Sequence, residues 1–189
     1  MKTLKTIALA LVALTTISAT AQQKKKVDVT KSKLTWVGKK VTGEHSGTVN
    51  LRDGVLIFKG KELTGGSFTV DMNSITVTDL KAGQGKEKLE GHLKNDDFFG
   101  TDKYDTASLE LTSVASKGNG AYTVKGNLTI KGKTEPIAFD MSVSGNSAKA
   151  KFNVDRTKYG IKYGSGSFFD NLGDKAINDE FEVTAALVF

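Results

Sequence analysis

The sequence contains no cysteine, and this absence removes several kinds of site at once. Without cysteine the chain has no disulfide bond, no thiolate zinc site, no iron–sulfur cluster and no cysteine nucleophile. A lipoprotein needs a cysteine directly after its cleavage site, so a lipid anchor of that kind is excluded as well. If the chain is exported, its packed core alone must stabilise it.

The familiar catalytic motifs are also missing. The two histidines, His45 and His92, do not have the H-x-x-x-H or H-E-x-x-H spacing, so nothing supports a histidine zinc site. No G-x-S-x-G, P-loop or strand-linked G-x-G-x-x-G pattern occurs. The adjacent Asp96 and Asp97 are typical of solvated or capping carboxylates. We therefore expect no catalytic residue, no metal site and no enzyme activity.

Long apolar runs are absent except for a short one near the N-terminus. Two lysines precede the run Thr6–Ile17, and an A-x-A motif ends at Ala21. This layout predicts a secretory signal peptide over residues 1–21, with cleavage between Ala21 and Gln22. About 12 apolar residues are too few to span a bilayer, which disfavours an N-terminal anchor. We expect residues 22–189 to form one domain, periplasmic or secreted, and soluble after cleavage.

Strong charge of one sign is lacking too. The full chain carries a net charge of +6, and loss of the predicted leader leaves 25 basic and 21 acidic residues. Three of the basic residues are Lys24–Lys26, which we expect to form a loose, solvated tail. A nucleic-acid-binding protein needs a concentrated basic face, so we expect no nucleic-acid partner.

What the sequence does contain is a repeated alternation of apolar and polar residues. Period-two patterning with β-branched and aromatic residues predicts strands. Clear cases are 67–73, 107–111, 122–131, 137–143, 148–154 and 181–189, with earlier strands expected at 33–41, 48–51 and 55–59. Turn signals are expected at Asp53-Gly54, Gly65-Gly66, Gly118-Asn119-Gly120, Lys131-Gly132-Lys133 and Ser144-Gly145-Asn146. Leu89 and Leu93, at i and i+4, predict a short helix over 86–94.

About eight antiparallel strands joined by short turns predict an all-β barrel or sandwich. The alternation does not say which face is inside, because an outer-membrane barrel turns its apolar face to lipid. A last strand that alternates from Phe181 to Phe189 is typical of such barrels, which keeps that alternative open. Four tyrosines and one tryptophan are few for the aromatic girdles of a membrane barrel, and this argues against it.

Six segments, in order, resemble the YceI-like family of exported lipid-binding proteins. They are Leu34–Gly38, Gly43–Gly47, Leu63–Met72, Leu89–Phe99, Gly126–Gly132 and Phe152–Ile161. Each motif is weak alone, but their number, order and spacing over Lys33–Phe189 are specific. The chain departs from the family pattern at Tyr104-Asp105-Thr106, where a proline often follows the tyrosine, and in the Gly/Ser-rich stretch Tyr163–Lys175.

The resemblance implies an eight-stranded antiparallel, lipocalin-like barrel with a short helix near one end and an elongated apolar tunnel. It implies that the apolar faces point inward and that the partner is a long-chain isoprenoid of quinone or polyprenyl type. No cofactor is expected other than such a bound lipid. Dimers are common in the family, so a homodimer is compatible with it.

Inward-facing residues of the predicted strands are the candidate ligand contacts. They are Trp36, Phe68, Val70, Met72, Leu109, Leu111, Val124, Leu128, Phe139, Met141, Phe152 and Val154. The alternative for each is ordinary barrel core, and the sequence does not distinguish a hollow barrel from a filled one. Small inward residues at 107, 126, 148, 150 and 185 favour some empty space.

Two polar residues are candidates for contact with a ligand head group. His45 lies between two glycines and is placed for the mouth of the barrel, although a turn histidine bonded to backbone is the alternative. Arg156 has the charge to attract a phosphate, although an ion pair with a strand carboxylate is the alternative. Phe98-Phe99 is interpreted as a plug beneath the helix. The functions left open are a lipid carrier, a structural or interaction barrel with a filled core, and an enzyme acting on bound lipid.

Overall fold

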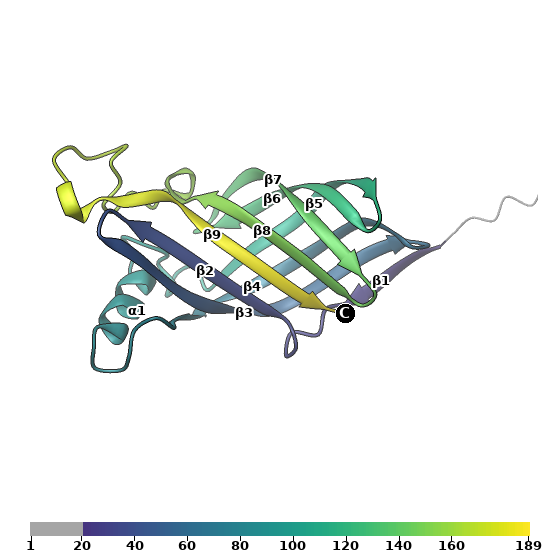
Figure 1. Cartoon of the computed structure of the whole chain (residues 1–189), viewed down its shortest axis with the longest axis horizontal. Coiled ribbons are helices and arrows are strands. Elements are labelled where there is room, and N and C mark those ends of the chain that lie inside the picture. The colour runs from purple at the N-terminus through teal and green to yellow at the C-terminus, as the bar shows by residue number, and fades with distance from the viewer. Residues whose placement is uncertain (1–20) are drawn as a thin grey trace, which may run out of the picture.

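The computed structural model of the protein describes residues 21–189 (Figure 1). The predicted signal peptide therefore lies outside the described residues, except for Ala21. The strands are β1 (Gln22–Lys26), β2 (Lys33–Lys40), β3 (Gly43–Lys59), β4 (Glu62–Val77), β5 (Thr106–Gly118), β6 (Ala121–Ile130), β7 (Lys133–Ser144), β8 (Ser147–Asp155) and β9 (Ile177–Val188). The helices are α1 (Lys86–Lys94) and two short 3-10 turns, η1 (Arg156–Tyr159) and η2 (Gly173–Lys175).

The strands form one antiparallel sheet that closes on itself. Each strand from β4 to β8 pairs with the next along the chain, β9 pairs with β2, and β2 pairs with β3. The β3–β4 pairing closes the ring, so β2 to β9 make an eight-stranded barrel. Closure removes the unpaired edges that an open sheet would present. The predicted barrel is confirmed, and the sandwich alternative is wrong.

The apolar side chains at alternate positions of each strand face the barrel interior. In β6, Tyr122, Val124 and Leu128 are buried, whereas Lys125 and Asn127 between them are exposed. The same alternation of buried and exposed side chains follows β7 and β8. A barrel that faces lipid would have the opposite arrangement, so the burial pattern favours the inward-facing interpretation.

The lysine-rich segment 24–26 is a strand, and the expectation of a loose, solvated tail is wrong. β3 is 17 residues long and extends beyond the end of β2, which leaves its second half with a free edge. β1 pairs with this edge, from Gln22 opposite Lys59 to Lys26 opposite Val55. The Lys25 ammonium also lies 5.2 Å from the ring of Phe58. Backbone pairing and a cation–π contact thus order a segment whose side chains are polar.

Two expected turns are instead parts of long strands. Asp53-Gly54 lies at a register shift within β3, which runs unbroken through the strands expected at 48–51 and 55–59. Gly65-Gly66 lies within β4, where a Cβ on Gly66 would come 2.7 Å from the carbonyl oxygen of Val55. Glycine here permits close approach of two strands, which is its other common use inside a sheet.

The two ends of the barrel differ. We call the end that carries the connections 41–42, 78–105, 131–132 and 156–176 the mouth end, and the other the closed end. Figure 1 shows α1 and the projecting segment 156–176 at the mouth end. The closed end holds buried side chains such as Leu56, Phe58 and Tyr122. Within residues 21–189, no helix has the length and apolar character needed to cross a membrane.

Candidate ligand-binding cavity

A cavity of about 240 Å³ lies inside the barrel, and its lining reaches from Met141 and Leu187, toward the closed end, to Phe98 and Arg156 at the mouth end. We call it the barrel cavity. Its wall is almost entirely apolar and receives side chains from all eight barrel strands, from α1 and from Phe98-Phe99. For comparison, an apolar cavity of about 150 Å³ stays dry and admits benzene. The barrel cavity therefore offers a water-excluding space for a hydrocarbon group.

Most of the candidate ligand contacts predicted from the sequence line this cavity. They are Trp36, Phe68, Val70, Met72, Leu109, Leu128, Phe139, Met141, Phe152 and Val154. Leu111 and Val124 do not line it and pack instead into the core of the closed end. Parity predicts that a residue faces inward, but it does not say how far along the barrel the interior is filled.

Sequence reasoning named 12 of the 36 lining residues as candidate ligand or head-group contacts and missed the other 24. Most lie on β2, β3, β9 and α1, and they include Leu34, Val49, Leu51, Ile75, Leu89, Leu93, Ile130, Phe181, Val183 and Leu187. For β9 the signal was available, because the same alternation that predicted the strand also places these side chains inside. Among the small inward residues, Ala107, Ala150 and Ala185 line the cavity, whereas Gly126 and Ala148 do not.

A histidine–carboxylate pair lies at the rim of the mouth. His45 Nδ1 lies 2.8 Å from Asp79 Oδ2, and the other carboxylate oxygen accepts the Ser46 N–H at 2.9 Å. Burial raises the pKa of Asp79, but these hydrogen bonds outweigh it and hold the pKa below its usual value. The pair joins the start of β3 to the connection that follows β4. The His45 side chain is half-buried and contributes to the cavity lining.

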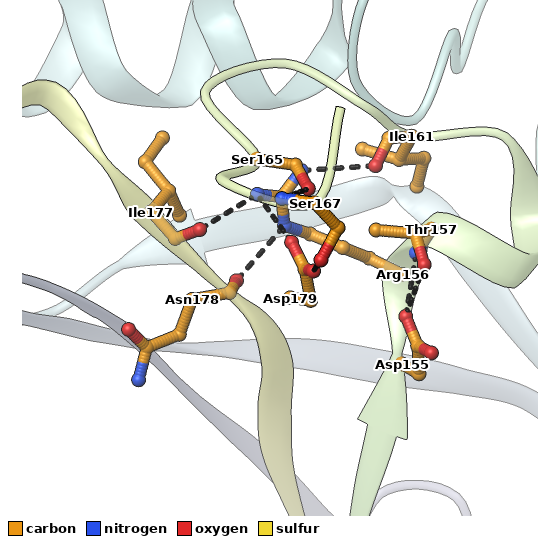
Figure 2. Close-up of polar contacts among 9 residues, drawn as sticks. All are labelled: Asp155, Arg156, Thr157, Ile161, Ser165, Ser167, Ile177, Asn178 and Asp179. Atoms are coloured by element: carbon orange, nitrogen blue, oxygen red, sulfur yellow. Dashed lines mark hydrogen bonds and ion pairs between the residues drawn. The ribbon is translucent and has the colours of Figure 1, made fainter. Parts of the chain in front are cut away.

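The Arg156 guanidinium is buried at the base of the segment 156–176 (Figure 2). It donates to the carbonyl oxygens of Asn178, Ile161 and Ile177 at 3.0, 2.9 and 3.0 Å. Asp179 Oδ1 lies 3.6 Å from Nη2. Since the carbonyls come from both sides of the segment, the side chain clasps its two ends together. The ion pair with Asp179 matches the structural alternative stated for Arg156.

Local sequence explains why Arg156 turns inward. Asp155 accepts the backbone N–H and the hydroxyl of Thr157 at 2.9 and 2.6 Å, which caps η1 directly after β8. Gly160 ends this turn with φ of 80°, a conformation that favours glycine. Burial lowers the pKa of Arg156, although Asp179 and Asp155 oppose this effect. Arginine stays charged in proteins, so the clasp carries a positive charge beside the cavity.

Aromatic contacts join the two covers of the mouth. Tyr163, in the segment 156–176, meets His92 of α1 edge to face, with ring centroids 4.4 Å apart. His92 also contacts Phe98 at 5.4 Å, and Phe98 contacts Phe99 at 5.5 Å. Phe98 and Phe99 are buried against Leu93, which confirms the plug beneath the helix. The mouth is thus covered from one side by α1 and its plug and from the other by the segment 156–176.

Trp36 forms part of the cavity wall where β2 pairs with β3. Its ring lies against Gly47, where a Cβ would come 2.5 Å from Trp36 Cζ2, so glycine makes room for the indole. Within residues 21–189, its Nε1 is one of two buried side-chain polar atoms without a hydrogen-bond partner. Trp36 is also the only tryptophan in the sequence, which makes it an intrinsic reporter of the cavity.

These features define a class of protein: a closed antiparallel barrel whose interior is packed at one end and hollow, apolar and covered at the other. Barrels of about eight strands have interiors wide enough to be filled by side chains or to hold one small ligand. A family model described as YceI-like domain matches residues 26–189, and the chain belongs to this family.

Curated relatives match part of the chain. A UPF0312 protein of Shewanella denitrificans is 35% identical over 91 residues, which are 48% of this chain and 45% of the relative. A UPF0312 protein of Vibrio cholerae is 31% identical over 99 residues, which are 52% of this chain and 50% of the relative. The chain thus aligns with about half the length of these relatives.

Solved structures share the fold over most of the chain. BcnA of Burkholderia cenocepacia superposes with a TM-score of 0.69 at 22% identity and covers 86% of this chain and 99% of its own. A polyisoprenoid binding domain from Saccharophagus degradans superposes with a TM-score of 0.58 at 15% identity, over 86% of this chain and 95% of that domain. These likenesses establish a common barrel architecture.

Proposed function

We propose that the protein binds a long-chain isoprenoid lipid, of quinone or polyprenyl type, in the barrel cavity and sequesters or carries it reversibly. The observation that carries the proposal is the hollow, apolar interior at the mouth end of a barrel whose other end is packed. A structural barrel with no ligand would gain stability by filling this space, because empty apolar volume is destabilising. Membership of the YceI-like family and the structural likeness to a polyisoprenoid binding domain support the same ligand class.

The size of the cavity sets how much of the ligand it encloses. Scaled from benzene, a volume of 240 Å³ holds about ten carbon atoms, or two isoprene units. Removing about ten carbons from water contributes roughly 8 kcal/mol before the cost of association. A longer chain is accommodated by movement of flexible lining side chains such as Met72 and Met141, or it leaves its outer units at the mouth.

We place the polar head of the ligand at the mouth end, near His45. Its imidazole is half-buried, lies at the rim and is oriented by Asp79. Arg156 contributes positive charge nearby, but its three bonds to backbone carbonyls give it the main task of holding the segment 156–176 in place. The ligand chain then runs inward past Trp36 toward the packed end.

Intrinsic fluorescence tests this proposal directly. A soluble quinone that carries two isoprene units is titrated into the delipidated protein, and the emission of Trp36 is followed. We expect saturable quenching, because a quinone held in the cavity lies close to the single indole. The same quinone without its prenyl chain is the control and should not saturate at comparable concentrations. Equal weak quenching by both compounds would overturn the proposal.

Export is a separate part of the proposal. We propose that the chain is cut between Ala21 and Gln22 and that the mature protein acts in the periplasm or outside the cell. Cell fractionation with N-terminal sequencing tests this, and we expect a mature chain that starts at Gln22. Recovery of the uncut chain from the cytoplasm would refute export without affecting the ligand assignment.

A further inference from the structure

Exposed apolar side chains gather at one end of the barrel. Among residues 21–189, the large hydrophobic side chains that are exposed are Val41, Tyr104, Tyr163, Phe168 and Phe169. All of them lie in connections of the mouth end, and the described connections of the closed end expose none. This asymmetry matters because scattered exposed apolar residues are ordinary, whereas a concentration of them marks an interaction site.

The projecting segment 156–176 carries the most prominent of these side chains. Phe168 and Phe169 are 47% and 51% exposed, and Figure 1 shows their segment extending beyond the ends of the strands. The backbone N–H of Val41 donates to the carbonyl of Ala176 at 3.3 Å, which ties the β2–β3 turn to the same segment. Arg156 holds the base of the segment, so the aromatic pair is presented on an anchored support.

A basic side chain lies beside the aromatic pair. The Lys162 ammonium lies 4.3 Å from the centroid of the Phe168 ring. Lys39, Lys40 and Lys175 are also exposed at the mouth end, as are the acidic Asp170 and Asp174. A ring with an ammonium directly beside it suits a bilayer interface, where the ring enters the apolar layer and the charge stays among the phosphates. Aromatic residues are also enriched at the level of lipid head groups.

We propose that the mouth end docks onto a lipid bilayer with anionic head groups, through Phe168, Phe169, the adjacent Lys162 and the other exposed lysines of this end. This inference deepens the proposed function, on which it rests, by naming the surface that delivers and receives the ligand. Docking places the cavity opening against the membrane, so an isoprenoid passes between bilayer and barrel without crossing water. A protein partner is the less favoured occupant, because a stable protein interface buries about 800 Å² per partner, whereas the exposed large apolar side chains among residues 21–189 are five and lie on three separate connections.

Vesicle binding tests the docking surface. The full mature protein is co-sedimented with vesicles of phosphatidylethanolamine and phosphatidylglycerol. We expect binding by the wild type and at least about a tenfold weaker partition for the double variant Phe168→Ser/Phe169→Ser, because two large apolar side chains no longer enter the interface. The charge variant Lys162→Glu/Lys175→Glu should also bind more weakly. Its matched control is Lys59→Glu/Lys61→Glu at the closed end, which should bind like the wild type.

A fluorescence reporter locates the contact. Phe168→Trp should give a blue-shifted emission when vesicles are added, whereas Lys61→Trp at the closed end should not respond. Failure of the wild type to bind, or unchanged binding by the double serine variant, would overturn the proposal. Lipid extraction from the same samples separates the two proposals: vesicle binding by a protein that never carries lipid refutes the cavity function and leaves the docking surface standing.

Discussion

Two alanines on one strand allow the cavity to be tested with a matched pair of substitutions. Ala148 and Ala150 both point inward from β8 and are both buried. Ala150 lines the barrel cavity and pairs with Ala185, which also lines it, so two small side chains lie side by side in the wall there. Ala148 belongs to the same buried cluster as Ala150 but does not line the cavity. Replacement of each by leucine adds three carbons at two inward positions of one strand, of which only the second lines the cavity.

The structure sets the size of the expected effects. Three carbons occupy about 75 Å³, close to a third of the 240 Å³ cavity. In Ala150→Leu they enter empty space, so we expect a melting temperature at or slightly above that of the wild type. The ligand loses room for three carbons, or about 2.4 kcal/mol, and its affinity falls about 60-fold.

The control behaves in the opposite way. Ala148→Leu overpacks the filled core at a cost of about 1–3 kcal/mol, which lowers the melting temperature by roughly 2–12 °C. Its affinity for ligand should remain near that of the wild type at temperatures where it is folded. Calorimetry gives the melting temperatures, and quenching of Trp36 gives the affinities. Equal destabilisation by both leucines would show that the space beside Ala150 is not empty, and unchanged affinity in Ala150→Leu would show that the ligand does not use it.

Three further predictions, one of them with a matched control substitution, test other parts of the structure. Arg156→Met leaves three backbone carbonyls without their buried donor and should lower the free energy of unfolding by about 3–5 kcal/mol in denaturant titrations; a loss below 1 kcal/mol would contradict the clasp. Burial raises the pKa of Asp179, but serine hydrogen bonds and Arg156 lower it to a net value below the usual one. Its contribution to stability is therefore present at neutral pH and lost as the pH falls below about 4, so Asp179→Asn should differ most from the wild type at pH 7 and converge with it near pH 2. Gly66→Ala brings a Cβ to 2.7 Å from the Val55 carbonyl oxygen and should cost about 2 kcal/mol or more, whereas Gly65→Ala meets nothing closer than 3.7 Å and should cost little; equal costs would count against this strand contact.

The residue pattern within each segment predicted most of the strands and the single α-helix. Period-two alternation identified the strands because one face of each is buried, and the Leu89/Leu93 spacing placed the helix at Lys86–Lys94, as observed. The same reasoning was wrong at Gly65-Gly66, because the Val55 carbonyl that requires glycine at position 66 belongs to the paired strand β3, and the local pattern does not reveal that contact. It was wrong at Lys24–Lys26 for a similar reason: the free edge of β3 that orders this segment depends on strand lengths that local patterns do not reveal.

The sequence predicted which side chains face the barrel interior, but not which of them line the cavity. Parity assigned Leu111 and Val124 to the interior, where they lie, but both pack into the buried core and do not line the cavity. The role of Arg156 depends on carbonyls at 161, 177 and 178, which only the folded chain brings to one guanidinium. The aromatic contact between Tyr163 and His92 likewise joins two segments that are distant in the sequence. The sequence alone therefore predicted the strand residues that line the cavity better than the contacts that hold its mouth together.

The most direct test of lipid binding is the content of the natively purified mature protein. The wild type and Ala150→Leu are purified without detergent, extracted with organic solvent and analysed by mass spectrometry against protein concentration. The account predicts close to one isoprenoid lipid per barrel in the wild type and a strongly reduced amount in Ala150→Leu. Absence of stoichiometric lipid from the wild type, together with no uptake from added prenyl lipids, would contradict it.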